Sequence, residues 1–376
     1  MPLDVRITPS WRELRCRLDA VRQNQPTPFQ AQPWLDAWYD TLPRRDDITA
    51  LPLEIVDTAT DKTVAALPLI KQRQGAFTVV AFADLSITDY NTPVFAPDAR
   101  LADTDVDQIL TRLAQRVPDA DILHLAKMPA EIHRSPNPFA SLPRASLSLL
   151  NANVLTIDGI WEDYRRKRLA KKVRKELERS WRVFERDAED ARFETIRDVD
   201  EALGLLPVLE ALHERRIAEL NDTYVLKDDP YRAFYRALIR EGLTSGDVSF
   251  TVSRDGPNRL VAGLIGLRVA ETFAMVRMAQ DFENWPQCSP GRLVIDQTIQ
   301  ALFADGVRVF DFTTGDYAYK DAFAVEHQPL YDLKMPLSVR GRFHLGRENM
   351  IEGVKSQVRR HPRLYEKLKA ITGRRD

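Results

Sequence analysis

A strand-like run that ends in a turn at residues 310–320 brings four reactive side chains close together in the sequence. The run reads Phe-Asp-Phe-Thr-Thr-Gly-Asp-Tyr-Ala-Tyr-Lys, so that Asp316, Tyr317, Tyr319 and Lys320 fall within five positions. Acyl transfer from a thioester needs a base for the acceptor, an acid for the departing thiolate and stabilisation of developing charge. We predict that Asp316 activates or positions the acceptor, that Tyr319 serves the thiolate and that Lys320 stabilises charge, with Tyr317 close to the substrate.

These side chains also have a structural interpretation. A turn aspartate such as Asp316 commonly hydrogen-bonds to its own backbone. Tyr317 and Tyr319 can anchor a core while their hydroxyls stay in water. However, all four lie in one turn at the end of a predicted strand, where α/β sheets bind ligands. That concentration favours a functional role.

A short loop before a predicted helix at 293–303 is the candidate for binding the phosphates of a donor. It reads Ser289, Pro290, Gly291 and Arg292. A helix N-terminus leaves backbone N–H groups unpaired and carries partial positive charge, so it can bind an anion. The same four residues also make an ordinary turn and helix start.

Two other segments are candidates for contacts with the acceptor. The loop at 83–100 contains Asp89 and Tyr90, which we expect to face a cleft between two domains; a capping turn is the alternative. His213 falls on a predicted helix and can act as a base or as a structural histidine. The six histidines show no paired spacing typical of zinc ligands, so no metal is expected.

The predicted elements run in the same order in both halves of the chain. A repeat of this length indicates a duplicated domain, and we predict an α/β (mixed α+β) fold with two mixed sheets covered by helices. The predicted helices are 34–42, 106–116, 199–220, 231–243 and 293–303, and the predicted strands are 51–56, 63–70, 77–82, 122–125, 248–253, 260–269, 272–279, 307–312 and 330–337.

This repeat sets the expected domain boundaries. We predict a first domain at 1–150 that supplies structure and acceptor contacts, a second at 151–345 that carries the chemistry, and a basic helical tail at 346–376. The segment 143–158 is the expected join. The tail helix should break at Pro362.

One predicted helix, at 165–182, is strongly basic. Apolar residues recur along it every four positions, which makes a stripe that can dock while the rest stays charged. The charged face can bind a polyanion such as tRNA, an acyl carrier protein or an anionic lipid surface, or it can be a solvated helix face. The basic residues are Arg165, Arg166, Lys167, Arg168, Lys171, Lys172, Arg174, Lys175, Arg179 and Arg182.

Composition limits the class of protein. A length of 376 residues makes two domains the default expectation, and 44% hydrophobic with 29% charged residues describes a globular chain. The net charge of −1 confines any attraction for an anionic partner to local patches. Two distant cysteines, Cys16 and Cys288, indicate a reducing compartment. With neither a signal-peptide core nor an apolar stretch of ~20 residues, we expect a cytoplasmic protein.

The chain resembles the GNAT-like acetyltransferases that are grouped with the cellulose-biosynthesis protein CelD and with a BioF-like domain, which are relatives of the FemABX peptidyltransferases. The matching residues are Phe310-Asp311-Phe312-x-x-Gly315-Asp316-x-x-Tyr319-Lys320, the preceding Ser289-Pro290-Gly291, Leu212-His213-x-x-Arg216, and near the start Phe29-x-x-x-Pro33-Trp34-Leu35 with Leu67-Pro68-Leu69.

This resemblance implies tandem GNAT-like domains that transfer an acetyl or other acyl group from an acyl-CoA or related thioester to an amine or hydroxyl, for example on a saccharide or envelope precursor. It adds Arg216 to His213 as a substrate contact. FemABX relatives use aminoacyl-tRNA instead, and the basic helix keeps that donor open. The anion loop departs from the common pattern, because Gly291 is its only glycine. A GNAT-like fold that binds an anionic partner without catalysis is the third possibility.

Overall fold

A computed structural model gives the structure of residues 2–18, 27–96, 101–132, 135–219, 226, 228–315 and 317–360. In the first half of the chain the elements are β1 (Leu3–Ile7), α1 (Trp11–Arg17), η2 (Pro28–Gln30), α2 (Gln32–Thr41), η3 (Leu42–Arg44), β2 (Ile48–Asp57), β3 (Lys62–Gln74), β4 (Phe77–Phe82), β5 (Val94–Phe95), α3 (Asp103–Arg116), β6 (Ile122–Pro129), β7 (Glu131–Ile132), β8 (Ser135–Pro136) and β9 (Ser146–Thr156).

The second half contains the remaining elements. They are α4 (Trp161–Asp163), the π-helical turn η4 (Tyr164–Arg168), α5 (Lys171–Asp187), β10 (Ala191–Ile196), α6 (Val199–Glu219), α7 (Asp229–Ser245), β11 (Val248–Asp255), β12 (Arg259–Val269), β13 (Thr272–Gln280), α8 (Pro290–Ala304), β14 (Val309–Asp311), α9 (Ala318–Asp321), β15 (Glu326–Pro336) and α10 (Val339–Arg360).

The strands form one continuous sheet across the described part of the chain. Its order is β1-β2-β3-β4-β6-β15-β9-β14-β13-β12-β11-β10, with β5 beside β3, which makes 13 strands. The mixed α/β class is therefore confirmed, but the prediction of two separate sheets is wrong. The reason is an exchange of strands: β9 pairs with β14 of the second half, and β15 pairs with β6 of the first.

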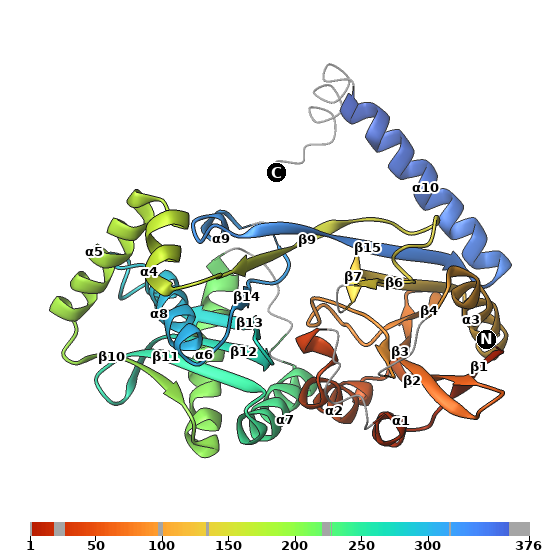
Figure 1. Cartoon of the computed structure of the whole chain (residues 1–376), viewed down its shortest axis with the longest axis horizontal. Helices are drawn as coiled ribbons and strands as arrows, with labels where there is room; N and C mark the ends of the chain where they lie inside the picture. The colour runs from red at the N-terminus through yellow and green to blue at the C-terminus, as the bar shows by residue number, and fades with distance from the viewer. Residues whose placement is uncertain are drawn as a thin grey trace.

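Both edges of this sheet show the same order of elements. From one edge, β1, β2, β3, β4 and β6 follow each other, and from the other edge β10, β11, β12, β13 and β14 do the same. The pairs β4–β6 and β13–β14 are both parallel. The predicted repeat is thus present, while a boundary after residue 150 would fall inside β9. Figure 1 shows β9 and β15 running side by side between the two halves.

The two halves share a hydrophobic core. Helices α2 and α7 lie against each other between the halves (Figure 1), where the ring of Trp34 meets that of Phe234 edge-on at 4.8 Å. Both side chains are fully buried. Arg45 on the first half also donates a hydrogen bond to the Tyr231 hydroxyl of the second at 3.2 Å. These contacts therefore hold the two halves together, and a site between them would have walls in fixed positions.

The predicted basic helix at 165–182 is interrupted. Leu169 and Ala170 are extended, so η4 ends before α5 begins. Arg165 on η4 bonds to Asp296 on α8 at 2.7 Å, and this pair ties the turn to the second half. Arg166, Lys167 and Arg168 on η4 are exposed but pair with Asp163 and Glu326, and the other exposed cations of this segment lie on α5.

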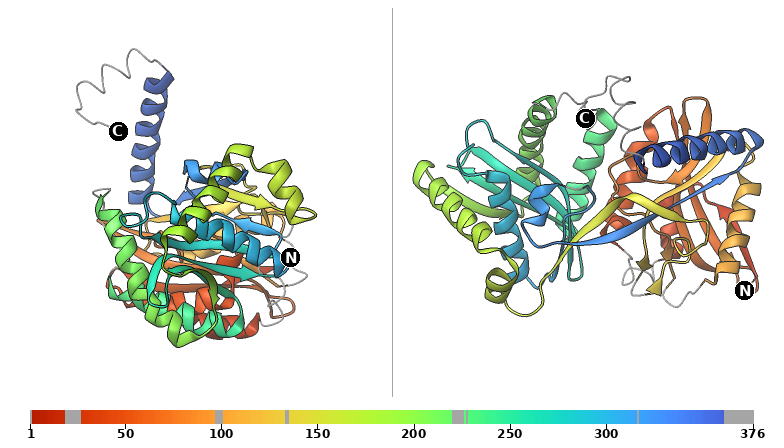
Figure 2. Two further views of the ribbon diagram at one scale, coloured as in Figure 1. Left: turned by 90° about the vertical axis from the view of Figure 1, so that its left-hand side faces the viewer. Right: turned by 90° about the horizontal axis from the view of Figure 1, so that it is seen from above.

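Helix α10 projects from the body (Figure 2), and it begins at Val339, before the predicted tail boundary at 346. Pro362 lies outside the described residues. None of the described helices has both the length and the apolar character needed to cross a membrane.

Candidate functional site

Strand β14 is much shorter than its parallel neighbour β13 and ends at Asp311. Strand β14 pairs with β13 only at Thr272, Phe273 and Ala274, although β13 continues to Gln280. Beyond Ala274 this edge of β13 therefore has no strand partner among the described residues. We call this unpaired edge the β13/β14 wedge. It lies at the carboxyl ends of parallel strands, which is where α/β sheets bind ligands.

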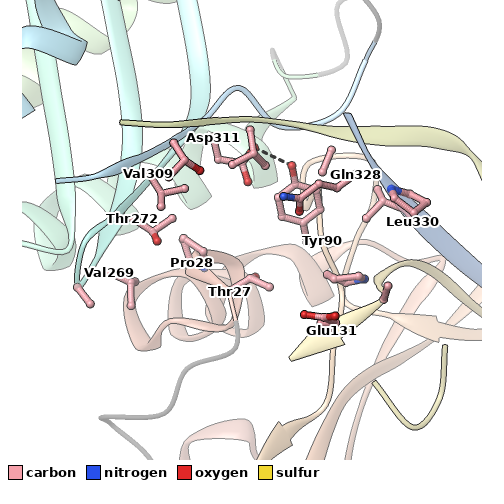
Figure 3. Close-up of a pocket in the computed structure, with 17 residues that line it drawn as sticks. Thr27, Pro28, Tyr90, Glu131, Val269, Thr272, Val309, Asp311, Gln328 and Leu330 are labelled. Carbon is pink, nitrogen blue, oxygen red and sulfur yellow. Dashed lines mark hydrogen bonds between the residues drawn. The ribbon is translucent and has the colours of Figure 1, made fainter. Parts of the chain in front are cut away.

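A cavity of about 740 Å³ lies between the two halves and reaches the paired part of β13 and β14 at Thr272, Val309 and Asp311. Figure 3 shows its walls: Thr27, Pro28 and Tyr90 come from the first half, whereas Thr272 and Asp311 come from β13 and β14. Strands β9 and β15 close the remaining side. The size is in the usual range for a small-molecule site.

Asp311 is the central polar group of this cavity. Its Oδ1 accepts the Tyr90 hydroxyl at 2.7 Å and the Thr313 N–H at 2.7 Å, while Oδ2 has no partner among the described residues. Burial raises the pKa of Asp311 to about 7; the two hydrogen bonds and the charge of Lys320 act in the opposite direction, and Asp89 adds to the rise. At neutral pH the carboxylate can therefore accept a proton at Oδ2.

The first half contributes two neighbouring residues to this cluster. Burial raises the pKa of Tyr90 well above its usual value, so its hydroxyl stays a donor to Asp311. Asp89 accepts a hydrogen bond from the Thr314 hydroxyl, and burial raises the pKa of Asp89 as well. The sequence placed both residues at a cleft, and the structure brings them against the turn that follows β14.

That turn is held in a strained shape by two buried donors. Thr313 has a φ of +61° and Gly315 a φ of +95°, and positive φ is costly for a β-branched residue such as threonine. The Lys320 Nζ donates to the carbonyls of Thr313 (3.2 Å) and Thr314 (2.6 Å), and the Asn153 Nδ2 donates to those of Thr313 (2.7 Å) and Gly315 (3.2 Å). Lys320 is 1% exposed, so it acts in the interior as a positioning group.

The other predicted residues of this turn have different positions. Asp316 lies outside the described residues. Tyr317 is 62% exposed and stacks on Tyr319 at 6.0 Å between ring centroids. Burial raises the pKa of Tyr319 to about 12, and neither tyrosine lines the cavity. Of the three predicted turn residues that the structure describes, Lys320 contacts the Asp311 cluster, through the turn carbonyls.

The predicted phosphate loop has occupied donors. Ser289 adopts a left-handed conformation ahead of Pro290, and the Gly291 N–H donates to the Gln280 Oε1 at 2.6 Å. The Arg292 N–H bonds back to the Ser289 carbonyl, and its side chain pairs with Glu176 at 3.4 Å. An anion can bind the Gly291 N–H only by displacing the Gln280 amide. A Cβ at Gly291 would lie 2.8 Å from that same amide oxygen, which explains the glycine.

His213 and Arg216 lie on α6, away from the cavity lining. Burial, with a smaller contribution from Arg277, lowers the pKa of His213 to about 4. A neutral imidazole of that pKa is a weak base at neutral pH. Arg216 is exposed and pairs with Glu219 at 2.8 Å. Among the described residues no group of three or more His, Cys, Asp or Glu side chains is arranged to hold a metal ion.

The sequence analysis assigned no role to Asp311 or Asn153. For Asp311 a signal was present: it is a charged residue between Phe310 and Phe312 in a run predicted to be a buried strand. Buried charges are rare without partners or function. For Asn153 no signal existed, because strand β9 reaches the site only through the exchange of strands between the halves.

Residues 171–321 match a family described as an acetyltransferase (GNAT) domain. No curated protein sequence matches the chain. Among solved structures, the C-terminal domain (DUF2156) of a putative lysylphosphatidylglycerol synthetase from Agrobacterium fabrum is 13% identical with a TM-score of 0.55 and covers 93% of this chain and 97% of its own. FemX is 9% identical with a TM-score of 0.56, covering 85% and 96%.

A tandem GNAT protein from the clavulanic acid biosynthesis pathway is 12% identical with a TM-score of 0.50, covering 89% of this chain and 99% of its own. At these identities the likeness concerns the fold alone. It extends over both halves of the chain, whereas the family match lies within the second half. The protein therefore has a GNAT-like mixed α/β fold of the tandem type, and its second half matches the acetyltransferase (GNAT) domain family.

Proposed function

We propose that the protein transfers an acyl group from a thioester to an amine bound in the cavity between the halves, with Asp311 as the proton acceptor. The observation that carries this proposal is the Asp311 Oδ2, which is unpaired among the described groups, in a carboxylate with a pKa near neutrality. The donor's acyl arm would lie in the β13/β14 wedge. There the free strand edge offers peptide groups to the amides of a pantetheine arm.

The charge of the cavity favours an amine over an anionic acceptor. Asp311 and Glu131 are the charged side chains among its described lining residues, and both are acidic. An alkyl amine has a pKa of ~10.4 and enters as an ammonium, which these carboxylates attract. An amino sugar or another envelope precursor is an acceptor of this kind. A hydroxyl acceptor would lack this attraction, although Asp311 can accept its proton in the same way.

The reaction follows from these positions. Asp311 takes a proton from the ammonium, the free amine attacks the thioester carbon, and a C–N bond replaces the C–S bond. The ammonium loses two protons in all: one ends on the released thiol and the other reaches solvent. Protonated Asp311, with a pKa of about 7, can return its proton to a thiolate, whose ordinary pKa is ~8.5. The pKa of Tyr319 is raised to about 12, so Tyr319 is a weaker acid than Asp311.

The direct test is an assay of thiol release. The protein is incubated with acetyl-CoA or a longer acyl-CoA and a panel of amines and alcohols, and the product is identified by mass spectrometry. We expect thiol release that depends on an amine. Absence of release with every donor, by a protein that is folded by circular dichroism, would rule out acyl-CoA as the donor. We also propose that the protein is related to the CelD-type and BioF-like proteins. A cytoplasmic location, where acyl-CoA occurs, is part of the same proposal.

We expect Tyr90→Phe to lower the rate of transfer by about 10- to 100-fold, which is the usual effect of removing a hydrogen bond to a charged group. The Tyr90 hydroxyl lowers the pKa of Asp311, so its removal should also move the acidic limb of the pH–rate profile to higher pH. Tyr231→Phe is the matched control, because it removes another hydroxyl contact between the halves outside the cavity. An unchanged profile for Tyr90→Phe would contradict its contact with the reacting carboxylate.

A second candidate function, transfer from aminoacyl-tRNA, is favoured by one observation. Four exposed cations, Lys171, Lys172, Lys175 and Arg179, gather on one face of α5 around Glu176. Glu176 pairs with Arg292 on α8, so a polyanion bound to this face of α5 would lie next to the loop before α8. A carrier protein with an acidic surface would use the same face.

We expect Lys171→Glu and Lys175→Glu to weaken tRNA binding and to lower the slope of log K against log salt by about one per lost phosphate contact. Lys62→Glu on β3 provides the control, because it reverses an exposed lysine on the other half. Fluorescence anisotropy with labelled tRNA at several salt concentrations measures both quantities. If both α5 variants bind tRNA like the wild type, this second candidate fails.

A further inference from the structure

Helix α10 rests on the body through one side. Gly341 packs so closely that a Cβ there would lie 1.9 Å from the Asp121 carbonyl oxygen. Leu345 is buried with Val79 and Ile122, and Glu348 pairs with Lys334 at 3.4 Å. These contacts define the inner side of α10 and anchor its first turns.

The opposite side of α10 is apolar and exposed. Val339, Phe343 and Met350 are 70%, 77% and 65% exposed. At about 100° per residue, their spacing places them within an arc of roughly 40°, on the side away from Gly341 and Leu345. Large apolar side chains aligned in this way on a helix, and facing solvent, mark an interaction surface. We call these three residues the α10 stripe.

Basic residues border this stripe. By the same helical geometry Arg342 and Arg347 fall on its two sides, and both are exposed. The sequence from 339 to 376 contains eleven Lys and Arg against four Asp and Glu, so this segment carries +7 in a chain with a net charge of −1. Figures 1 and 2 show α10 extending away from the body, in agreement with the exposure of the stripe.

We propose that α10 docks the protein on an anionic lipid bilayer, with Val339, Phe343 and Met350 entering the headgroup–acyl boundary and Arg342 and Arg347 contacting lipid phosphates. A helix with one apolar side bordered by cations is the form that lies in a membrane interface. Juxtaposed arginines add attraction to anionic lipids and lose it at high salt. The proposal is independent of the donor and acceptor.

Charge favours a lipid surface over two other partners that could cover the α10 stripe, which are a second copy of the chain and the segment beyond residue 360. A second copy of the chain would bring the same arginines against each other, and like charges disfavour that pairing. The segment beyond residue 360 is itself basic, with five Lys and Arg against two acidic residues, so it is a poor cover for the stripe. An anionic lipid surface satisfies both the apolar and the charged residues.

The test is flotation of the full-length protein with vesicles. One set contains equal parts phosphatidylglycerol and phosphatidylcholine, and the other contains phosphatidylcholine alone. We expect the wild type to float with the anionic vesicles, to stay behind with the neutral ones, and to detach at high salt. Phe343→Glu and Arg342→Glu should each lower the partition coefficient about tenfold or more. Leu149→Glu, at a side chain on β9 that is 94% exposed, is the control and should float like the wild type.

Three results would overturn the proposal. The first is a wild type that does not float with anionic vesicles. The second is a Phe343→Glu variant that floats as well as the wild type, with its fold checked by urea unfolding. The third is a wild-type dimer in light scattering that becomes a monomer in Phe343→Glu, because the stripe would then be an interface between copies of the chain.

Discussion

Asp311→Asn should lower kcat/KM for acyl transfer by about 10²- to 10⁴-fold, the usual contribution of a positioned proton acceptor. The substitution is close to isosteric, and the asparagine Oδ1 can still accept from Tyr90 and from the Thr313 N–H, so the surrounding geometry should persist. For the wild type we expect the rate to rise with pH through about 7, where the carboxyl group loses its proton. The variant should show no such rise.

The same substitution should change stability in a pH-dependent manner. The pKa of Asp311 is raised from 3.8 in the unfolded reference to about 7 in the folded protein, so the folded state binds the proton more tightly. This contribution to stability is fully present below pH 3.8 and is lost as the pH rises to about 7. Asp311→Asn should therefore gain in stability relative to the wild type between acidic and neutral pH in urea unfolding.

Asp36→Asn is the matched control for both effects. Asp36 is also a fully buried carboxylate, and burial raises its pKa, but it lies on α2 beside Arg12 and Arg15 and not in the cavity. Its replacement should affect stability while the pH–rate profile keeps its midpoint. Equal losses of kcat in the two variants would contradict the role of Asp311, because a general effect on folding would then explain both.

Lys320→Met should destabilise the protein by about 1–3 kcal/mol, the usual cost of leaving a buried hydrogen-bond acceptor without its donor. Methionine fills a similar volume but leaves the carbonyls of Thr313 and Thr314 without their buried donor. The Lys320 charge also lowers the pKa of Asp311, so its loss should move the acidic limb of the pH–rate profile to higher pH. Urea unfolding and the pH–rate profile measure the two effects separately.

Lys71→Met provides the comparison, because Lys71 forms a partly exposed ion pair with Asp119 at 2.8 Å. Such pairs contribute about 0–1 kcal/mol. Lys320→Met could destabilise the protein through packing alone, in which case the pH profile of the remaining activity would stay unchanged. That result would reduce Lys320 to a structural residue of the turn.

Local patterns in the sequence were sufficient for the individual elements. Alternating and helical periodicity located strands such as β4 and β13 and helices such as α6 and α8, because each buries one face against a single core. The repeated order of these elements then indicated the tandem architecture. The exchange of β9 and β15 between the halves could not be predicted, since the pattern of a strand records its burial but not its neighbour.

The sequence indicated the site through the polar turn at 316–320 and not through Asp311. Asp316 and Lys320 stood out because polar residues gather there, whereas Asp311 looked like part of a buried strand. Its properties depend on Tyr90, which is more than 200 residues earlier in the chain and reaches Asp311 only because the halves pack together. A pKa set by burial and by a distant hydroxyl cannot be derived from the spacing of residues.

The loop before α8 shows the opposite case. Ser289, Pro290 and Gly291 form the expected helix start, but the Gly291 N–H is paired with Gln280. A helix N-terminus in the sequence therefore predicts donors without predicting whether another side chain already occupies them.

The most direct test of the central claim is a crystal structure of the protein with an acyl-CoA thioether analogue and an amine acceptor. We predict that the acyl arm lies along β13 in the β13/β14 wedge, and that the acceptor nitrogen lies in the cavity within about 3–3.5 Å of both the Asp311 Oδ2 and the acyl carbon. A donor bound outside the wedge, or an acceptor bound outside the cavity, would contradict the assignment of Asp311 and of the space between the halves as the place of acyl transfer.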